Sequence, residues 1–158
     1  MLFERAMSTA IETERLKIRP AGPGDCAPIA GLIAQLGYEA SETDVVERLA
    51  VMEAEKRLVL VAELDGAVIG CLSTSVMRVL HRPAPVGRIS MMVIDEALRG
   101  RGIGARLVRA AEGALRDSGC YMVEVTSHMR RADAHRFYER LGYERTSVRL
   151  ARELRDET

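Results

Sequence analysis

The chain has 158 residues, of which 47% are hydrophobic, and Lys plus Arg and Asp plus Glu both number 23. That length suits one domain of ordinary size, and that hydrophobic fraction is enough for a core, which excludes wholesale disorder. The balanced charge argues against a dedicated nucleic-acid binder, because such proteins usually carry a basic excess.

The first third of the chain predicts a strand followed by two helices. Leu16 and Ile18 alternate with charged residues within residues 13–20, as in a half-buried strand. Asp25 is a plausible N-cap for the first helix, because it follows a Gly/Pro turn. Residues 41–44 resemble a capping box that opens the second helix.

The middle of the chain predicts a β-hairpin and then a buried strand. Residues 58–64 and residues 68–76 flank Asp65-Gly66, a two-residue turn of the kind that favours hairpins. Residues 89–94 are nearly all apolar, which indicates a short strand that is buried on both faces.

The last third of the chain predicts helices that alternate with strands. An amphipathic helix starts near Gly102 and stops before Gly119. Residues 122–126 form another strand, residues 132–141 another helix, and residues 147–150 a last strand. This order of elements is typical of an α/β (α+β) fold with a mixed sheet. We expect a single domain over residues 1–158, with residues 1–13 as a loose leader.

The cysteines and the apolar runs suggest neither a metal centre nor a membrane protein. Cys26, Cys71 and Cys120 are far apart and form no CxxC or Cys/His cluster, so we interpret them as buried small residues. No apolar run approaches the roughly 18 residues that a membrane helix needs, and the N-terminus lacks a signal-peptide pattern. We therefore expect a cytoplasmic protein with no metal, no membrane partner and no nucleic-acid partner.

The sharpest motif is a glycine-rich turn between the buried strand and the amphipathic helix. It reads Arg99-Gly100-Arg101-Gly102-Ile103-Gly104. Glycines let backbone N–H groups approach a ligand, and a helix start carries unpaired N–H groups with partial positive charge. With two arginines this favours a phosphate or pyrophosphate, although a tight turn that binds nothing is the alternative. A Walker A loop and a GxGxxG dinucleotide motif both fit poorly.

Two motifs resemble those of the GCN5-related N-acetyltransferases. The CoA signature of that family, (Arg/Gln)-x-x-Gly-x-(Gly/Ala), is matched by Arg99, Gly102 and Gly104. The family's second motif is matched by Ala134, Phe137, Tyr138 and Leu141-Gly142-Tyr143. The resemblance implies a mixed, mostly antiparallel central sheet flanked by helices. It also implies that the chain transfers an acetyl group from acetyl-CoA to a primary amine by direct attack in a ternary complex.

The same resemblance implies which residues bind acetyl-CoA. The pantetheine arm pairs with the backbone of Met92, Val93 and Ile94. The pyrophosphate is held by backbone amides from Arg99, Gly100, Arg101, Gly102, Ile103, Gly104 and Ala105. Tyr138 stands where the family often has a tyrosine that protonates the leaving thiolate, although a tyrosine on an amphipathic helix is usually a packing residue.

The general base does not carry over from the family. A Glu that is often found at the start of the central strand is replaced here by Arg88. Glu63, Glu124 and His128 are the remaining candidates, each of which also reads as a surface residue, and direct loss of the proton to water is a further route.

Three points stay open at the level of sequence. A non-catalytic acetyl-CoA-binding sensor is the alternative function, since the usual base is missing. The acceptor is a small-molecule or protein amine that the sequence does not specify. A homodimer is expected if a partner chain covers the sheet edge that residues 147–150 would expose.

Overall fold

The computed structural model describes residues 15–155, and these divide into two compact units with the boundary after Val125. The leader that we expect over residues 1–13 lies outside the described residues. The first unit holds the sheet and most of the helices, and the second holds one helix and the C-terminal segment.

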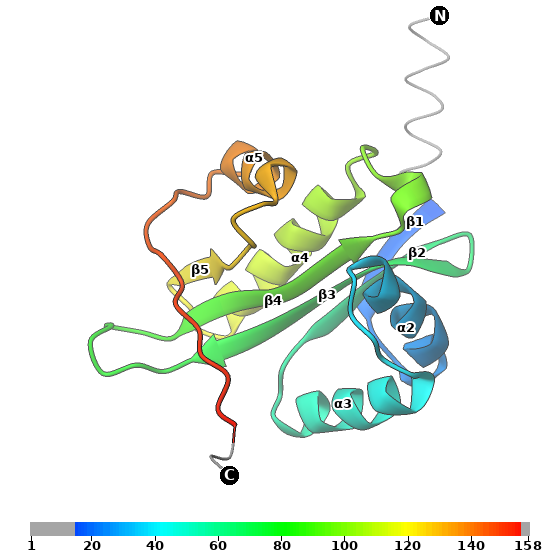
Figure 1. The fold of residues 1–158 in the computed structure, drawn as a ribbon, viewed down its shortest axis with the longest axis horizontal. Coiled ribbons are helices and arrows are strands. Elements are labelled where there is room, and N and C mark those ends of the chain that lie inside the picture. Colours follow the sequence, from blue (N-terminus) through cyan, green and yellow to red (C-terminus); the bar gives the residue numbers. More distant parts are fainter. Residues whose placement is uncertain (1–14, 156–158) are drawn as a thin grey trace, which may run out of the picture. The chain divides into compact units, whose positions relative to one another are not determined.

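The first unit is built on one five-stranded sheet whose strands follow the chain order (Figure 1). The strands are β1 (Leu16–Pro20), β2 (Val59–Leu64), β3 (Ala67–Met77), β4 (Val86–Ile94) and β5 (Met122–Val125). The pairings from β1 to β4 are antiparallel, and β4 pairs with β5 in parallel. The predicted mixed, mostly antiparallel sheet is therefore confirmed.

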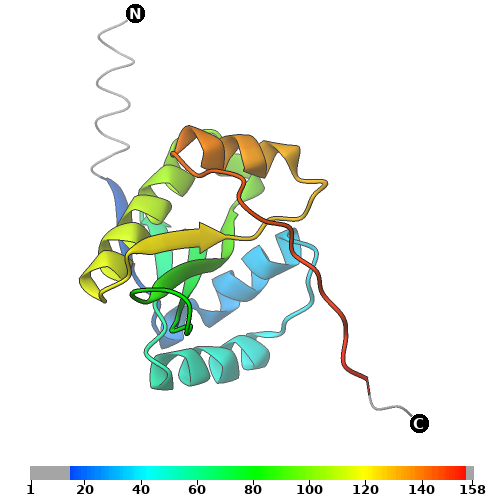
Figure 2. The same cartoon turned by 90° about the vertical axis from the view of Figure 1, so that its left-hand side faces the viewer.

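Helices cover both faces of this sheet (Figure 2). The helices α2 (Cys26–Gln35) and α3 (Glu42–Ala54) enclose one core, in which Ile29 and Val45 pack with Cys71 of β3 and Val93 of β4. The other face carries α4 (Ile103–Asp117), which lies so close that a Cβ at Gly87 of β4 would come within 2.8 Å of a Leu115 methyl.

Local signals account for several of these elements. Asp65 and Gly66 take positive φ values of 51° and 83°, as a two-residue hairpin turn between β2 and β3 requires. The side chain of Ser41 accepts the Asp44 N–H at 3.0 Å, and Asp44 Oδ2 accepts the Ser41 N–H at 2.8 Å. This reciprocal pair is the predicted capping box at the start of α3.

Asp25 is the N-cap residue of α2, as predicted, but its carboxylate makes no capping bond to that helix. Instead it accepts the Gly22 N–H at 2.7 Å, within the 3₁₀ turn η1 (Pro23–Asp25), and two hydrogen bonds from Arg19 of β1. The guanidinium of Arg19 also binds Glu63 of β2 at 2.6 Å, so one arginine joins β1, β2 and the start of α2.

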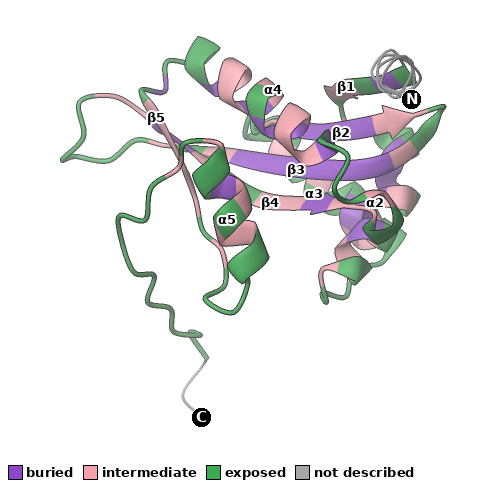
Figure 3. Cartoon of the chain, turned by 90° about the horizontal axis from the view of Figure 1, so that it is seen from above, coloured by how far each residue is buried: buried purple, intermediate pink, exposed green. Residues whose placement is uncertain are grey.

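The central strand is longer and less buried than residues 89–94 predicted (Figure 3). It begins at Val86, and only part of it is enclosed, because Ser90 is exposed and Met92 is half-buried. Ser73 pairs with Met91 and Thr74 with Ile89, which leaves Ser90 as the extra residue of a β-bulge.

The second unit contains α5 (Ala132–Arg140), close to the predicted helix 132–141. Residues 141–155 form no helix or strand, so the predicted strand at residues 147–150 is wrong. Val148 and Leu150 are 79% and 90% exposed, which shows that their alternation with arginines marks no buried face. The homodimer that we expected from this strand loses that basis and stays a prediction.

The three cysteines are buried, as predicted. Burial raises the pKa of each thiol, and that of Cys71 reaches about 12. None of the helices within residues 15–155 combines the length and the apolar character that crossing a membrane requires.

Candidate active site

The glycine-rich turn lies between β4 and α4. After the 3₁₀ turn η2 (Glu96–Leu98), Gly100 and Gly102 adopt left-handed φ values of 79° and 78°. A Cβ at either glycine would meet nothing within 4 Å, so the space next to both glycines is open. The side chain of Arg99 is exposed, and its Nε donates to the Ile94 carbonyl at 3.3 Å. The turn therefore combines open backbone with a guanidinium beside it.

The start of α4 leaves backbone donors unused. Gly102 is the N-cap and makes no side-chain capping bond, and the first helical hydrogen bond runs from the Arg106 N–H to the Gly102 carbonyl at 3.2 Å. Within residues 15–155, the N–H groups of Ile103, Gly104 and Ala105 have no hydrogen-bond partner. These donors coincide with the positive end of the helix dipole, an arrangement suited to an anion.

The position of this helix start is fixed by contacts along α4. The Arg106 Nη2 donates to the Leu16 carbonyl of β1 at 3.0 Å. Further along, Leu107 and Leu115 are buried against the sheet. The donors at the N-terminus of α4 are thus held by a helix that is packed along its length.

Beyond its contact with β5, the backbone of β4 has no pairing strand on one side within residues 15–155, and we call this edge uncovered in that sense. The parallel pairing of the two strands ends at Ile89 and Val125, whereas β4 continues to Ile94. Residues 91–94 pair with β3 on one side, and no strand among the described residues pairs with residues 90–94 on the other. The predicted pantetheine residues, Met92, Val93 and Ile94, lie within this uncovered segment.

One hydrogen bond ties the end of α2 to the chain just before the turn. Gln35 Oε1 accepts the Glu96 N–H at 2.9 Å. This hydrogen bond joins the C-terminal end of α2 to η2, the 3₁₀ turn that precedes Arg99.

A polar group lies on the face of β4 that points away from α4. Because side chains alternate along a strand and Gly87 faces α4, Arg88 points to the opposite face. There its Nε and Nη2 donate to Glu124 Oε1 of β5 at 2.8 and 2.5 Å. On the same face Ser90 Oγ lies 2.8 Å from Ser73 Oγ. The Arg88–Glu124 pair was not predicted, because the sequence does not show that these residues are opposite each other in the sheet.

The three candidate bases have different surroundings. Glu124 is the partner of Arg88, and Glu63 is the partner of Arg19. His128 belongs to the second unit, where it is exposed and its Nδ1 accepts the Arg130 N–H at 3.2 Å. The structure therefore does not gather the three in one place within either unit.

Tyr138 also belongs to the second unit, in α5. It is buried, and its ring makes edge contacts with Phe137 and Tyr143 at centroid distances of 5.0 and 5.5 Å. Burial raises the pKa of the phenol to about 12, against a smaller lowering effect of Arg131. The hydroxyl is therefore a proton donor, not a phenolate, at neutral pH.

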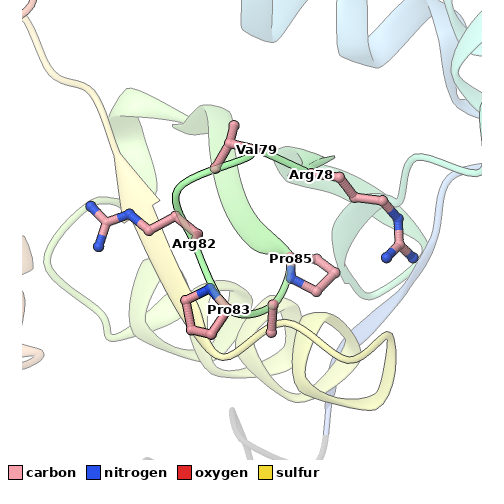
Figure 4. Close-up of a pocket in the computed structure, with 6 residues that line it drawn as sticks. Arg78, Val79, Arg82, Pro83 and Pro85 are labelled. Atoms are coloured by element: carbon pink, nitrogen blue, oxygen red, sulfur yellow. The ribbon is translucent and has the colours of Figure 1, made fainter.

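A cavity of about 260 Å³ lies in the loop between β3 and β4, away from the turn. It is lined by residues 78, 79 and 82–85, and the side chains of Arg78 and Arg82 point away from each other (Figure 4). Since β4 joins this loop to the turn, the two features lie at opposite ends of that strand, about 26 Å apart at about 3.3 Å per residue. No group of three His, Cys, Asp or Glu within residues 15–155 could hold a metal ion.

Related proteins cover most of this sequence. The model of the acetyltransferase (GNAT) family matches residues 28–143. An aminoalkylphosphonate N-acetyltransferase of Salmonella typhimurium is 30% identical over 143 residues, covering 87% of this chain and 91% of that protein. Glucosamine 6-phosphate N-acetyltransferase 1 of Oryza sativa subsp. japonica is 31% identical over 147 residues, covering 87% and 86%.

Solved structures show the same fold. Glucosamine-6-phosphate N-acetyltransferase from Arabidopsis thaliana has a TM-score of 0.78 at 21% identity, covering 89% of this chain and 99% of that one. An aminoglycoside N-acetyltransferase in complex with CoA has a TM-score of 0.78 at 19% identity, covering 89% and 95%. The family model spans most of the chain, and its relatives match over nearly their full length, so this chain belongs to the acetyltransferase (GNAT) family and is an acyltransferase.

Proposed function

We propose that this enzyme transfers the acetyl group of acetyl-CoA to the primary amine of a small acceptor that also carries a phosphate or phosphonate group. The observation that carries the proposal is that the structure has both unused N–H donors at the start of α4 and an uncovered backbone edge on β4. Acetyl-CoA supplies the acyl group in activated form, as a thioester.

The residues of the turn fit a pyrophosphate. The N–H groups of Ile103, Gly104 and Ala105 are without protein partners in the described chain, and open space adjoins Gly100 and Gly102. Neighbouring positive charge comes from the guanidinium of Arg99 and from the helix dipole. We assign the CoA pyrophosphate to this turn, residues 99–105.

The uncovered edge of β4 fits the amides of a pantetheine arm. An extended chain with its own N–H and C=O groups can hydrogen-bond to a strand edge as a further strand would. We assign this role to the backbone of Met92, Val93 and Ile94, which would hold the thioester in a fixed orientation. Such orientation alone removes several kcal/mol of barrier in general, roughly 7–11 kcal/mol at best.

Tyr138 is our candidate for the proton donor. As the amine nitrogen bonds to the acetyl carbon, the C–S bond breaks, the amine loses a proton to solvent or a base, and the sulfur takes the phenol proton. The position of Tyr138 in the family motif supports this role, as does a phenol pKa of about 12, which keeps the hydroxyl protonated. Solvent then returns a proton to the phenolate.

The proposed acceptor class comes from the relatives. The two curated relatives described above are named for an aminoalkylphosphonate and for glucosamine 6-phosphate. Both names describe a primary amine on a small molecule with a phosphorus oxyanion. We take this shared chemistry as the acceptor class of the present enzyme.

The test is release of the CoA thiol with a panel of amines. We expect turnover with 2-aminoethylphosphonate and glucosamine 6-phosphate, with kcat/KM rising with pH as more amine becomes neutral. Only about one part in a thousand of an amine with a pKa near 10 is neutral at pH 7. Binding of acetyl-CoA without thiol release for any amine would show a sensor and contradict the proposal.

A further inference from the structure

The polar group on the face of β4 and β5 that points away from α4 has no part in binding CoA as proposed above. It consists of Arg88, Glu124, Ser73 and Ser90, here called the β4–β5 polar group. From these residues we infer a subsite that recognises the acceptor: Glu124 receives its ammonium group, which loses a proton to solvent before the nitrogen attacks, and Arg88 with Ser90 receives its oxyanion. This inference rests on the proposed function and names the residues that select the substrate.

The β4–β5 polar group lies near the end of the pairing between β4 and β5. Arg88 and Glu124 are directly opposite in the β4–β5 register, one pair before the pairing ends at Ile89 and Val125. Ser90 follows Ile89 in β4 and forms the bulge at which the uncovered edge begins. The β4–β5 polar group therefore lies at the point where the two strands part, next to the segment assigned to the thioester arm.

The β4–β5 polar group lies on the face of the sheet opposite α4. Arg88 points away from α4, as shown above, and Ser73 is on the same face as Cys71, which packs against α2. The helix whose N-terminus is assigned to the pyrophosphate thus covers the other face. An acceptor bound at the β4–β5 polar group would reach the β4 edge without crossing α4.

The Arg88–Glu124 pair has hydrogen-bonding capacity that it does not use. Arg88 binds Glu124 through Nε and Nη2, and both contacts go to the single oxygen Oε1. Within residues 15–155, Arg88 Nη1 and Glu124 Oε2 have no hydrogen-bond partner. The two side chains are 37% and 36% exposed, so one cationic and one anionic group are within reach of solvent.

The serine pair adds a neutral donor. Two hydroxyls carry two hydrogens, and their mutual bond at 2.8 Å uses one of them. Ser73 is buried and Ser90 is exposed, so when Ser73 donates to Ser90, the Ser90 O–H is left to donate outward. An oxyanion of the acceptor can accept this hydrogen bond from Ser90. The contact does not compete with Glu124, which is assigned to the ammonium group.

Together these groups match a molecule that carries both charges. A carboxylate oxygen accepts from an ammonium, and a guanidinium with a hydroxyl donates to a phosphonate or phosphate. An acceptor without the oxyanion would make only half of these contacts. The β4–β5 polar group is therefore a specificity determinant for amines that bear an anionic group.

The experiment compares two acceptors of similar size, 2-aminoethylphosphonate and propylamine, by CoA thiol release. In the wild-type enzyme we expect a clear preference for the phosphonate. R88M should lower kcat/KM for 2-aminoethylphosphonate at least ~10-fold, mainly through KM, and change that for propylamine by less than ~3-fold. S90A should cause a smaller loss, again only with the phosphonate.

Variants of Glu124 separate ammonium binding from oxyanion binding. E124Q should raise KM for both acceptors, because both carry the ammonium. In R88M the unpaired Glu124 carboxylate could repel the anionic phosphonate, and the double variant R88M/E124Q removes that repulsion. If Arg88 binds the oxyanion, the double variant should still show no preference for the phosphonate. The matched control is R109M, which removes an exposed arginine from α4 and should leave both acceptors unchanged.

The outcomes that overturn the inference differ from those that overturn the proposed function. If R88M lowers the melting temperature and reduces turnover of both acceptors equally, the pair only fastens β5 to β4. A wild-type enzyme that acetylates both amines without preference excludes this subsite and the proposed acceptor class, while acetyl transfer from acetyl-CoA to an amine stands. Absence of thiol release with any amine, with acetyl-CoA bound in calorimetry, would remove the proposed function and this inference with it.

Discussion

Arg19 donates two hydrogen bonds to Asp25, from Nη1 to Oδ2 at 2.7 Å and from Nη2 to Oδ1 at 2.9 Å. The Asp25 side chain is only 9% exposed, and the bond from Arg19 is the main cause that holds its carboxyl pKa below the usual value of 3.8. A carboxylate with a lowered pKa in the folded state stabilises the fold above the unfolded-state pKa. That contribution is lost as the pH falls through the folded-state pKa.

Asp25→Asn should therefore lower the free energy of unfolding by about 1.5–3 kcal/mol at pH 7, because it removes a charge-assisted, nearly buried interaction. The difference from the wild type should shrink as the pH falls below the unfolded-state pKa of about 3.9, and it should vanish only below the lowered pKa of Asp25 in the folded state. Urea denaturation of the wild type and the variant, at pH 7 and across the acid range, measures this difference in the free energy of unfolding. Asp65→Asn is the control, since the exposed pair of Asp65 with Arg15 should contribute less than about 1 kcal/mol.

Gly102→Asp should reduce CoA affinity by more than ~10-fold, because it places bulk and negative charge beside the unused N–H groups of α4. Calorimetry with CoA measures the loss. Gly66→Asp is a matched control, since Gly66 has a similar φ of 83° and open space around it but lies in the β2–β3 turn. Both variants should lose similar stability, and undiminished CoA affinity in Gly102→Asp would exclude the turn as the pyrophosphate site.

Tyr138→Phe should lower kcat by about 10²–10⁴-fold, the usual contribution of a general acid, while acetyl-CoA affinity changes only a few fold. The phenol matters when the thiolate leaves, not when CoA binds. Because its pKa is about 12, ionisation of Tyr138 should cause no fall in kcat between about pH 8 and 10. Tyr143→Phe serves as the control, and an unchanged kcat in Tyr138→Phe, with chemistry rate-limiting, would mean that Tyr138 only packs.

The three thiols of the folded protein should not react with a disulfide reagent. Cys26, Cys71 and Cys120 are 1%, 0% and 8% exposed, and burial raises the pKa of each, so little reactive thiolate is present. Titration of the native enzyme should show almost no reaction within minutes, and titration in denaturant should show all three. Rapid reaction of the native protein would indicate that one cysteine is accessible.

Elements with a complete local signal could be predicted from the sequence. The capping box at Ser41 and Asp44 involves neighbours in the chain, as does the Asp65-Gly66 turn. The glycine turn before α4 likewise has its determinants within a few residues. These signals do not depend on how distant segments pair.

Features that depend on distant partners could not be predicted. The sequence predicts the N-cap position of Asp25 but not that its carboxylate binds Arg19, because that contact depends on where β1 lies in the fold. The bulge at Ser90 arises from pairing with β3, which also brings Ser73 to it. The segment at residues 147–150 has strand-like alternation, but alternation alone provides no neighbouring strand to bind.

The pairing between β4 and β5 ends before β4 does, and this affects how the purified enzyme should be stored. Residues 90–94 present a row of backbone donors and acceptors beside an otherwise paired sheet, and such rows can template pairing between chains. A bound thioester arm that occupies this edge would compete with self-association. Purified enzyme should therefore stay monodisperse longer when it is stored with CoA, and light scattering during storage would reveal the difference.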